Sequence, residues 1–405
     1  MKIEFLILII LTVFSSVISV IYYMVNVYLS RKREKIRFES ERLTSGDATV
    51  VITVYREPVD HLKRAISSVR DQVKEIIVVG DGVKDPYESL CREENVIFVS
   101  NSTRSGKRKS MALGVSLVRT KIVFFMDGDM IPEGDAISKI LKEYSPEIGG
   151  VGGNINFDTS GGNFTSYASQ FIERSKEIIQ RSMKPFGSVM LIDGGFGSYR
   201  MSLVGNYIQS PEFHDFRIEG KIPYYGGGDD ADLTSYIIKR GYVATKAFDA
   251  RVTTIPKENI KAYFKQSVRW SRTGWRTFVN NIRNGTMKKA NVFYRIEQTL
   301  TYVLPVVFFA VILLRGTIFL EILARRGFFP ALISMIGLHF HYHIDLYETL
   351  YRLSTTSSAI ASLVFAGSVA RRTVKDRLKT IAYGSIGAAL LFLATIYAMF
   401  TMNRA

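Results

Sequence analysis

Residues 121–129 read Lys-Ile-Val-Phe-Phe-Met-Asp-Gly-Asp. The short apolar run predicts a buried strand, and the acidic turn after it marks the carboxyl end of that strand. Asp127 and Asp129 flank a glycine, which allows a tight turn. Two such carboxylates can reach one divalent ion, Mg²⁺ or Mn²⁺, which takes few protein oxygens and completes its shell with a diphosphate. Acidic turns also follow strands where no metal binds, so this motif alone leaves both interpretations open.

The residues upstream repeat the same alternation of strand and helix. Strands are predicted at 48–55, 75–80 and 96–100, and helices at 60–72 and 109–118. Short apolar strands separated by helices predict an α/β domain with a doubly wound, mainly parallel sheet. Such sheets bind ligands beyond the carboxyl ends of their strands. Tyr55, Asp81 and Asp127 each follow a strand, so we expect polar side chains to converge on one rim.

Three further segments are candidates for chemistry at that rim. Ser105-Gly106-Lys107-Arg108 opens a helix, and cations beside a helix N-terminus attract phosphate. Gly226-Gly227-Gly228-Asp229-Asp230 precedes a helix predicted at 231–240, where an acid can serve as a general base or simply as a cap. Gln266-Ser267-Val268-Arg269-Trp270 can bind a diphosphate through Arg269 and stack a sugar on Trp270. The same segment also fits an amphipathic helix on a membrane surface.

Both ends of the chain are apolar. Phe5–Leu29 contains no charged residue, is long enough to span a bilayer and is predicted to be an uncleaved anchor rather than a signal peptide. Basic residues between Arg31 and Arg37 follow at once, which predicts a cytosolic location for the next domain. A second span is predicted at 299–320, with further apolar runs at 328–340, 357–370 and 381–400. We favour a count in which only one of the two short runs crosses, because the basic stretch 371–379 then lies inside.

The charge and residue composition indicate what kind of surface or ligand the protein binds. The net charge is +16, and much of the excess lies beside the apolar segments. That position favours an anionic membrane surface over nucleic acid, for which the chain has no helix-turn-helix or zinc-finger pattern. A single cysteine, Cys91, excludes an internal disulfide. His339, His341 and His343 would chelate a metal from a strand, but they end an apolar run, where histidine suits the membrane interface.

Taken in order, seven motifs resemble those of membrane-integrated family 2 glycosyltransferases. Hyaluronan synthase is the nearest in pattern, with cellulose and chitin synthases more distant. The motifs are Val54-Tyr55-Arg56-Glu57, Gly80-Asp81-Gly82, Ser105-Gly106-Lys107-Arg108, Asp127-Gly128-Asp129, Asp193-Gly194-Gly195, Gly228-Asp229-Asp230 and Gln266-x-x-Arg269-Trp270. The resemblance covers about 50–275.

The resemblance implies a division of the chain into four parts. An N-terminal transmembrane helix and its basic flank would occupy 1–34, and a GT-A-like catalytic domain 35–259. Interfacial helices would follow at 260–298, and a C-terminal transmembrane region at 299–405. The protein would be a multi-pass protein of the cell membrane with its catalytic domain in the cytosol.

The resemblance also implies roles for the donor-binding residues. Asp81 would bind the base of the nucleotide, in a pocket lined by Tyr55 and Arg56. Lys107 would contact the diphosphate. Asp127 and above all Asp129 would hold the metal ion, Mn²⁺ or Mg²⁺.

The remaining motifs would handle the acceptor. Asp230, beside Asp229, would be the general base for the acceptor hydroxyl. Gly194 and Gly195 would lie next to the acceptor sugar. Gln266, Arg269 and Trp270 would hold the diphosphate and the acceptor end.

The implied function is inverting transfer of a sugar from a nucleotide-sugar donor, UDP-linked by preference, to a glycan or a lipid-linked acceptor. Both tryptophans are at 270 and 275, so the W-G-T-R segment of hyaluronan synthases has no counterpart. Addition of a single sugar to a membrane lipid is therefore an alternative to chain elongation. A non-catalytic membrane scaffold is a third hypothesis, against which the intact set of acidic residues argues.

Overall fold

The computed structural model describes residues 3–32, 40–214, 217–218, 224–225, 228–336, 346–373 and 376–403. Its central element is an eight-stranded sheet in the order β3-β2-β1-β4-β7-β6-β10-β5. The strands are β1 (Ala48–Val54), β2 (Glu75–Gly80), β3 (Ile97–Ser100), β4 (Ile122–Asp127), β5 (Ile131–Pro132), β6 (Ile148–Phe157), β7 (Phe196–Arg200) and β10 (Val243–Thr254), with β8 (Arg217–Ile218) and β9 (Tyr224–Tyr225) as a separate pair. The predicted strands at 48–55, 75–80, 96–100 and 121–126 match β1 to β4 within one residue at each end.

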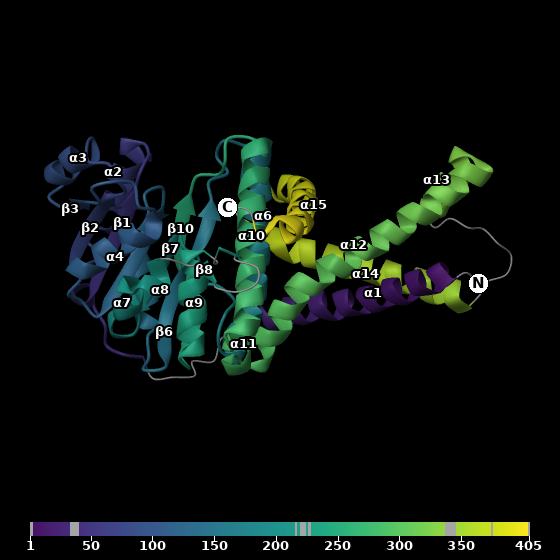
Figure 1. Ribbon diagram of the computed structural model, residues 1–405, viewed down its shortest axis with the longest axis horizontal. Coiled ribbons are helices and arrows are strands. Elements are labelled where there is room, and N and C mark those ends of the chain that lie inside the picture. Colours follow the sequence, from purple (N-terminus) through teal and green to yellow (C-terminus); the bar gives the residue numbers. More distant parts are fainter. Residues whose placement is uncertain are drawn as a thin grey trace.

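Helices cover both faces of the sheet (Figure 1). The helices of the domain are α2 (Val59–Val69), α3 (Tyr87–Glu93), α4 (Lys107–Leu117), α5 (Ala136–Lys142), α6 (Phe164–Met183), α7 (Met201–Gln209), α8 (Pro211–His214), α9 (Asp229–Lys239), α10 (Ile260–Arg283) and α11 (Thr286–Lys289). Val50 and Ile52 of β1 pack with α2, α3 and α5, whereas Val51 packs with α4, α7 and α9 on the other face. A strand buried on both faces is apolar throughout, which explains the continuous runs in the sequence.

The sheet is mixed rather than wholly parallel. β1, β2, β3 and β4 pair in parallel, as do β6 and β10. β7 runs antiparallel between β4 and β6, and the short β5 pairs antiparallel with β10. The prediction of a mainly parallel α/β domain is thus confirmed, with β7 joining its two parallel parts.

Three long helices extend together from the domain: α1 (Ile3–Leu29), α12 (Val292–Arg326) and α14 (Leu346–Arg371) (Figure 1). Asn26 of α1 donates a hydrogen bond to Glu297 of α12 at 3.1 Å. Arg31, just beyond α1, donates to Ser368 of α14 at 3.0 Å. The carboxyl ends of α1 and α14 and the start of α12 therefore meet at the domain.

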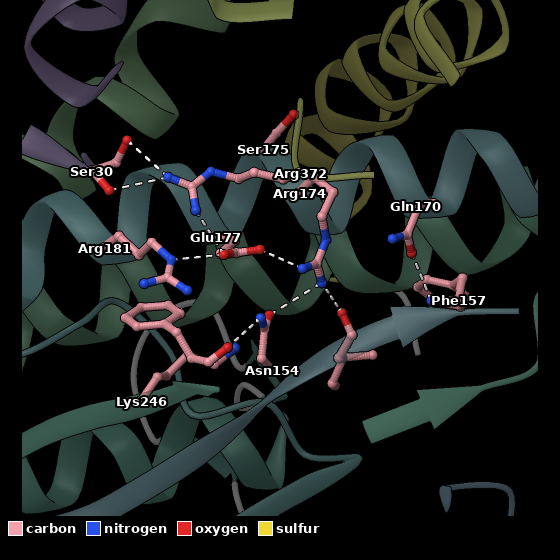
Figure 2. Close-up of polar contacts among 12 residues, drawn as sticks. Ser30, Asn154, Phe157, Gln170, Arg174, Ser175, Glu177, Arg181, Lys246 and Arg372 are labelled. Carbon is pink, nitrogen blue, oxygen red and sulfur yellow. Dashed lines mark hydrogen bonds and ion pairs between the residues drawn. The ribbon is translucent and has the colours of Figure 1, made fainter. Parts of the chain in front are cut away.

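The junction between this bundle and the domain is charged and buried. Glu177 of α6 accepts hydrogen bonds from Arg174, Arg181 and Arg372 (Figure 2). Arg372, just after α14, also donates to the Ser30 carbonyl at 3.1 Å. One carboxylate thus connects α6 with the ends of α1 and α14.

Among the described residues, four helices are long and apolar enough to cross a membrane: Leu6–Leu29 in α1, all of α12, Thr349–Arg371 in α14, and α15 (Arg377–Thr401). α13 (Phe328–Ile336) has nine described residues, fewer than a span needs. Of the two short apolar runs, 357–370 lies within a described helix of spanning length, whereas 328–340 is described only to residue 336. His339, His341 and His343 lie outside the described residues.

Candidate active site

The pairing register places the carboxyl ends of β1, β2 and β4 at the same level of the sheet. Thr53 of β1 pairs with Asp127 of β4, and Val54 pairs with Gly80 of β2. Tyr55, Asp81 and Asp127 consequently leave the sheet at the same rim. The predicted convergence of polar residues is observed.

Lys107 lies at the centre of this rim, in the first turn of α4. Its Nζ atom is 2.7 Å from Oδ1 of Asp127 and 3.2 Å from Oδ2 of Asp229. It also donates to the Gly194 carbonyl at 3.3 Å. Burial opposes the charge of Lys107, but Asp127 and Asp229 outweigh burial and hold the lysine pKa above its usual value. Asp127 of β4 and Asp229 of α9 thus share the charge of Lys107 in α4.

Asp230 is next to Asp229 in the chain but has different partners. Its Oδ2 accepts from the Gly194 backbone at 3.1 Å, and its Oδ1 from Ala231 at 2.8 Å. Burial, and next the charge of Asp229, raise the pKa of Asp230 to about 6, with Lys107 opposing them. For Asp229, burial is outweighed by Lys107 and Arg108, which lower its pKa. One carboxylate is firmly ionised, and its neighbour can take up a proton near neutral pH.

Asp127 and Asp129 fit the chemistry of a divalent cation. Burial and the charge of Asp127 raise the pKa of Asp129, so a cation at this point would offset the repulsion between the largely buried Asp129 and the more exposed Asp127, which already binds Lys107. Mg²⁺ and Mn²⁺ sites that also bind phosphates need only one or two protein carboxylates. Among the described residues no three acids or histidines form a complete ligand set. The pair therefore suits an ion that shares its shell with a substrate.

The proposed nucleotide pocket is built from two loops. Asp81 is buried, and its Oδ1 accepts from the backbone of Ser105 at 2.7 Å and of Gly106 at 3.0 Å. Gly82 has a φ of +73°, and a Cβ there would lie 2.3 Å from the Arg104 nitrogen, so this turn requires glycine. The Arg104 guanidinium stacks 4.2 Å from the Tyr55 ring centroid. Arg104 was not among the predicted site residues, and its position after β3 was the available signal.

The segment with Gln266, Arg269 and Trp270 is part of α10 and borders the acidic cluster. Arg269 is exposed, and Trp270 is 40% exposed. One turn further along α10, the Thr273 methyl group would lie 3.3 Å from a Cβ at Gly228. α10 therefore packs on the Gly228-Asp229-Asp230 segment. Arg269 and Trp270 lie about one helical turn from this contact and Gln266 about two turns from it, with no direct bond to the acids among the described contacts.

Asp193 has a partner set that the sequence did not reveal. Its carboxylate binds Lys176 of α6 at 2.8 Å and Lys246 of β10, and Asp193 and Lys246 are buried. These lysines outweigh burial and lower the pKa of Asp193. Gly194 follows directly and donates to Asp230, while the Gly195 carbonyl accepts from the Asp127 backbone at 3.0 Å. Asp193 thus anchors the two glycines between the candidate base and the candidate metal pair.

A second buried pair supports α9. Arg108 binds Asp232 at 2.7 Å, and Tyr207 donates to the same carboxylate at 3.0 Å. These two contacts give Asp232 a structural role in holding α9. Among the acids at the start of α9, Asp230 is the one without a direct cationic partner in the described contacts.

Comparison with known proteins identifies the family that this chain resembles. Residues 49–207 match the family model described as Glycosyl transferase family 2. An N-acetylglucosaminyltransferase of Rhizobium meliloti is 26% identical over 242 residues, which cover 56% of this chain and 55% of the relative. Hyaluronan synthase 3 of Xenopus laevis is 24% identical over 291 residues, or 59% of this chain and 51% of the relative. The chain spans about half the length of the curated relatives that it matches.

A solved structure extends the similarity to most of the chain. A mannosyltransferase from Pyrobaculum calidifontis, in complex with GDP-Man and Mn²⁺, superposes with a TM-score of 0.60 at 17% identity. The match covers 89% of this chain and 99% of that one. It supports a GT-A-like fold with flanking helices, and the sequence relatives confirm the resemblance to hyaluronan synthase. Residues 49–207 therefore form a family 2 glycosyltransferase domain within this chain.

Proposed function

We propose that this protein transfers a sugar, with inversion, from a nucleotide-sugar donor to a hydroxyl group of a glycan or lipid-linked acceptor at the membrane. One observation carries the proposal. Asp230, with a pKa raised to about 6, stands beside the cluster of Lys107, Asp127 and Asp229, and among the described contacts it makes no direct ion pair with Lys107. A general base needs a pKa near ambient pH, and a leaving diphosphate needs fixed cations nearby.

The chemistry divides between these residues. The acceptor oxygen attacks the anomeric carbon from the face opposite the diphosphate and loses its proton to Asp230. The bond from that carbon to the diphosphate breaks, and the nucleoside diphosphate leaves with the electron pair. Lys107 and Arg269 would stabilise its charge. A divalent cation on Asp127 and Asp129, when bound, would supply further charge stabilisation.

We further propose that Tyr55, Arg56 and Asp81 bind the nucleoside, and that Gln266, Trp270, Gly194 and Gly195 position the acceptor. The exposed Trp270 ring supports sugar stacking. The names of the relatives make N-acetylglucosamine the first donor sugar to test. The basic residues after α1 support a cytosolic domain, with the bundle in the cell membrane. Addition of one sugar to a lipid uses the same residues and is the alternative.

The test uses the full chain purified in detergent. UDP- and GDP-sugars are supplied with Mn²⁺ or Mg²⁺ and a lipid or glycan acceptor, and both nucleotide release and product size are measured. We expect one donor to be turned over, and Asp230→Asn to lower kcat by about 10²–10⁴-fold, the usual contribution of a general base. Asp249→Asn, at an exposed acid of β10, is the matched control and should leave turnover unchanged.

Product size then separates the alternatives. A ladder of products supports elongation, and one lipid-soluble product supports single addition. Equal turnover by the parent protein and Asp230→Asn would overturn the assignment of the base. No turnover with any donor in the panel would overturn the enzymatic hypothesis.

A further inference from the structure

The last helix, α15, packs along the domain rather than within the three-helix bundle. Figure 1 shows it beside α6 and α10, at the end of the bundle nearest the domain. Tyr263 of α10 donates to the Gly387 carbonyl at 3.3 Å, and Trp275 donates to the Thr395 carbonyl at 3.0 Å. On the α6 side, a Cβ at Gly384 would lie 2.3 Å from the Phe171 ring, so the two helices touch closely. These contacts extend over most of the length of α15.

Both ends of α15 are tied to the domain. At its start, Asp376 accepts a hydrogen bond from Tyr167 of α6 at 2.5 Å. At its end, the Met402 carbonyl accepts from Arg276 of α10 at 2.7 Å. A helix of 25 residues is about 37 Å long, so a crossing orientation would separate these ends by a whole bilayer. α10 would then have to cross as well, and its many lysines and arginines make that costly.

The contacts that α10 and α15 make along α12 show how far α15 lies from α10. Tyr302 of α12 stacks on Phe278 of α10, with ring centroids 4.7 Å apart. Phe309, seven residues further along α12, contacts Phe400 of α15 at 6.5 Å. Seven residues of helix rise about 10 Å, which is the separation of two packed helices. α15 therefore lies one helix layer beyond α10 in the direction in which the bundle leaves the domain.

The face of α15 turned away from the domain is apolar and exposed. Its large members, which recur every three to eight residues, are Leu378, Ile386, Leu393, Tyr397 and Phe400. Ala382 and Ala389 fall on the same face and are also exposed. Arg377 and Lys379 flank its start, where they can meet lipid phosphates. The stripe can face lipid, while the opposite face of α15 packs on α6 and α10 in place of a charged surface.

We infer that α15 lies in the plane of the membrane interface, against lipid, and does not cross the bilayer. Of the four described helices of spanning length, α1, α12 and α14 then cross, and the end of α15 is on the same side as the glycosyltransferase domain. α15 forms a layer between lipid and α10, so the helix with Gln266, Arg269 and Trp270 is held at the membrane surface. This inference does not depend on the proposed reaction.

Sidedness gives the first test. Single cysteines are placed in the full chain with Cys91→Ala, and a membrane-impermeant maleimide is added to sealed vesicles before and after permeabilisation. Asn403→Cys reports the end of α15, Gly134→Cys the domain, and Arg326→Cys the far end of α12; all three positions are exposed. We expect Asn403→Cys to react together with Gly134→Cys and opposite to Arg326→Cys. Reaction of Asn403→Cys with the Arg326→Cys side would overturn the inference.

Depth gives the second test. Nitroxide labels at cysteines replacing Leu378, Ile386, Leu393 and Phe400 are compared for collision with oxygen and with a water-soluble relaxing agent in lipid bilayers. A helix in the interface gives nearly the same depth at all four positions, and this result would support the inference. A profile that is deepest in the middle and shallow at both ends is that of a crossing helix and would contradict it. Labels shielded from both reagents, with cross-links between two copies, would also contradict it, because a second copy would then cover the stripe.

Discussion

At the scale of residues, Asp229 and Asp230 differ in charge environment although they are adjacent. Lys107 neutralises Asp229, whereas burial and Asp229 itself raise the pKa of Asp230 to about 6. A base with this pKa is protonated below about pH 6 and available above it. We therefore predict that kcat/KM rises with pH through about 6 and levels off above it.

Variants of Lys107 test the assignment of Asp230 as the general base. Its charge lowers the pKa of Asp230, so Lys107→Met should move the acidic limb of the kcat/KM profile to higher pH, in addition to reducing activity. Conservative Lys107→Arg should retain the original limb. A profile that is flat from about pH 5 to 8 in the parent protein would show that another group accepts the proton.

The ionised Asp230 carboxylate should lower the free energy of unfolding. The folded-state pKa of Asp230 is raised, so its ionisation above about pH 6 is opposed by the fold, and the cost disappears as the pH falls towards its ordinary value of 3.8. Asp230→Asn removes that charge with little change of shape. We predict a higher thermal midpoint than the parent at about pH 8, with the difference shrinking towards about pH 4. An unchanged or lower midpoint at about pH 8 would contradict the raised pKa.

At the scale of elements, Asp193 connects α6, β10 and the loop before β7. Lys246 is as buried as Asp193 itself, and removal of one partner of a buried ion pair costs about 3–5 kcal/mol. We predict that Asp193→Asn, which leaves Lys246 unpaired, lowers the thermal midpoint by several degrees, and that Lys246→Met lowers it less, because Asp193 keeps Lys176. The double variant should lose clearly less than the sum, because no buried charge is left unpaired by the second change. Additive losses would mean that the two side chains do not act as a pair.

Local pattern predicted some elements well and could not reach others. The runs that became β1, β2 and β4 are buried on both faces, so their apolar character alone identifies them, whereas β3 at the sheet edge is only partly buried. The position of β7 between β4 and β6 depends on pairing across about 50 residues or more, which no local period records. The sequence identified Asp193 only as part of the Asp193-Gly194-Gly195 motif. Its ion pairs with Lys176 and Lys246 could not be predicted, because these lysines lie 17 and 53 residues away in the chain. Hydropathy makes α15 a candidate span, but it registers composition alone and could not show that Tyr167 of α6 and Trp275 of α10 donate hydrogen bonds to this helix and its N-cap.

At the scale of the whole molecule, the domain and the bundle are joined through Glu177. Three arginines, Arg174, Arg181 and Arg372, share this buried carboxylate. They outweigh burial and lower its pKa, so its contribution is present above its usual pKa and constant across neutral pH. The junction therefore depends on one negative charge among several positive ones.

Glu177→Gln should loosen that junction without unfolding the sheet. The variant leaves the buried Arg174 without its counter-charge, which we expect to cost about 3–5 kcal/mol locally. Hydrogen exchange measured by mass spectrometry should accelerate in α6 and at the end of α14, while β1 and β4 keep their protection. Glu177→Asp keeps the charge and should restore much of the protection, whereas Glu88→Gln, at an acid of α3 far along the chain from this junction, should change nothing in α6. Equal exchange in Glu177→Gln and the parent would show that packing of Phe171 and Ile178 against α1 and α14 is sufficient to hold the domain to the bundle.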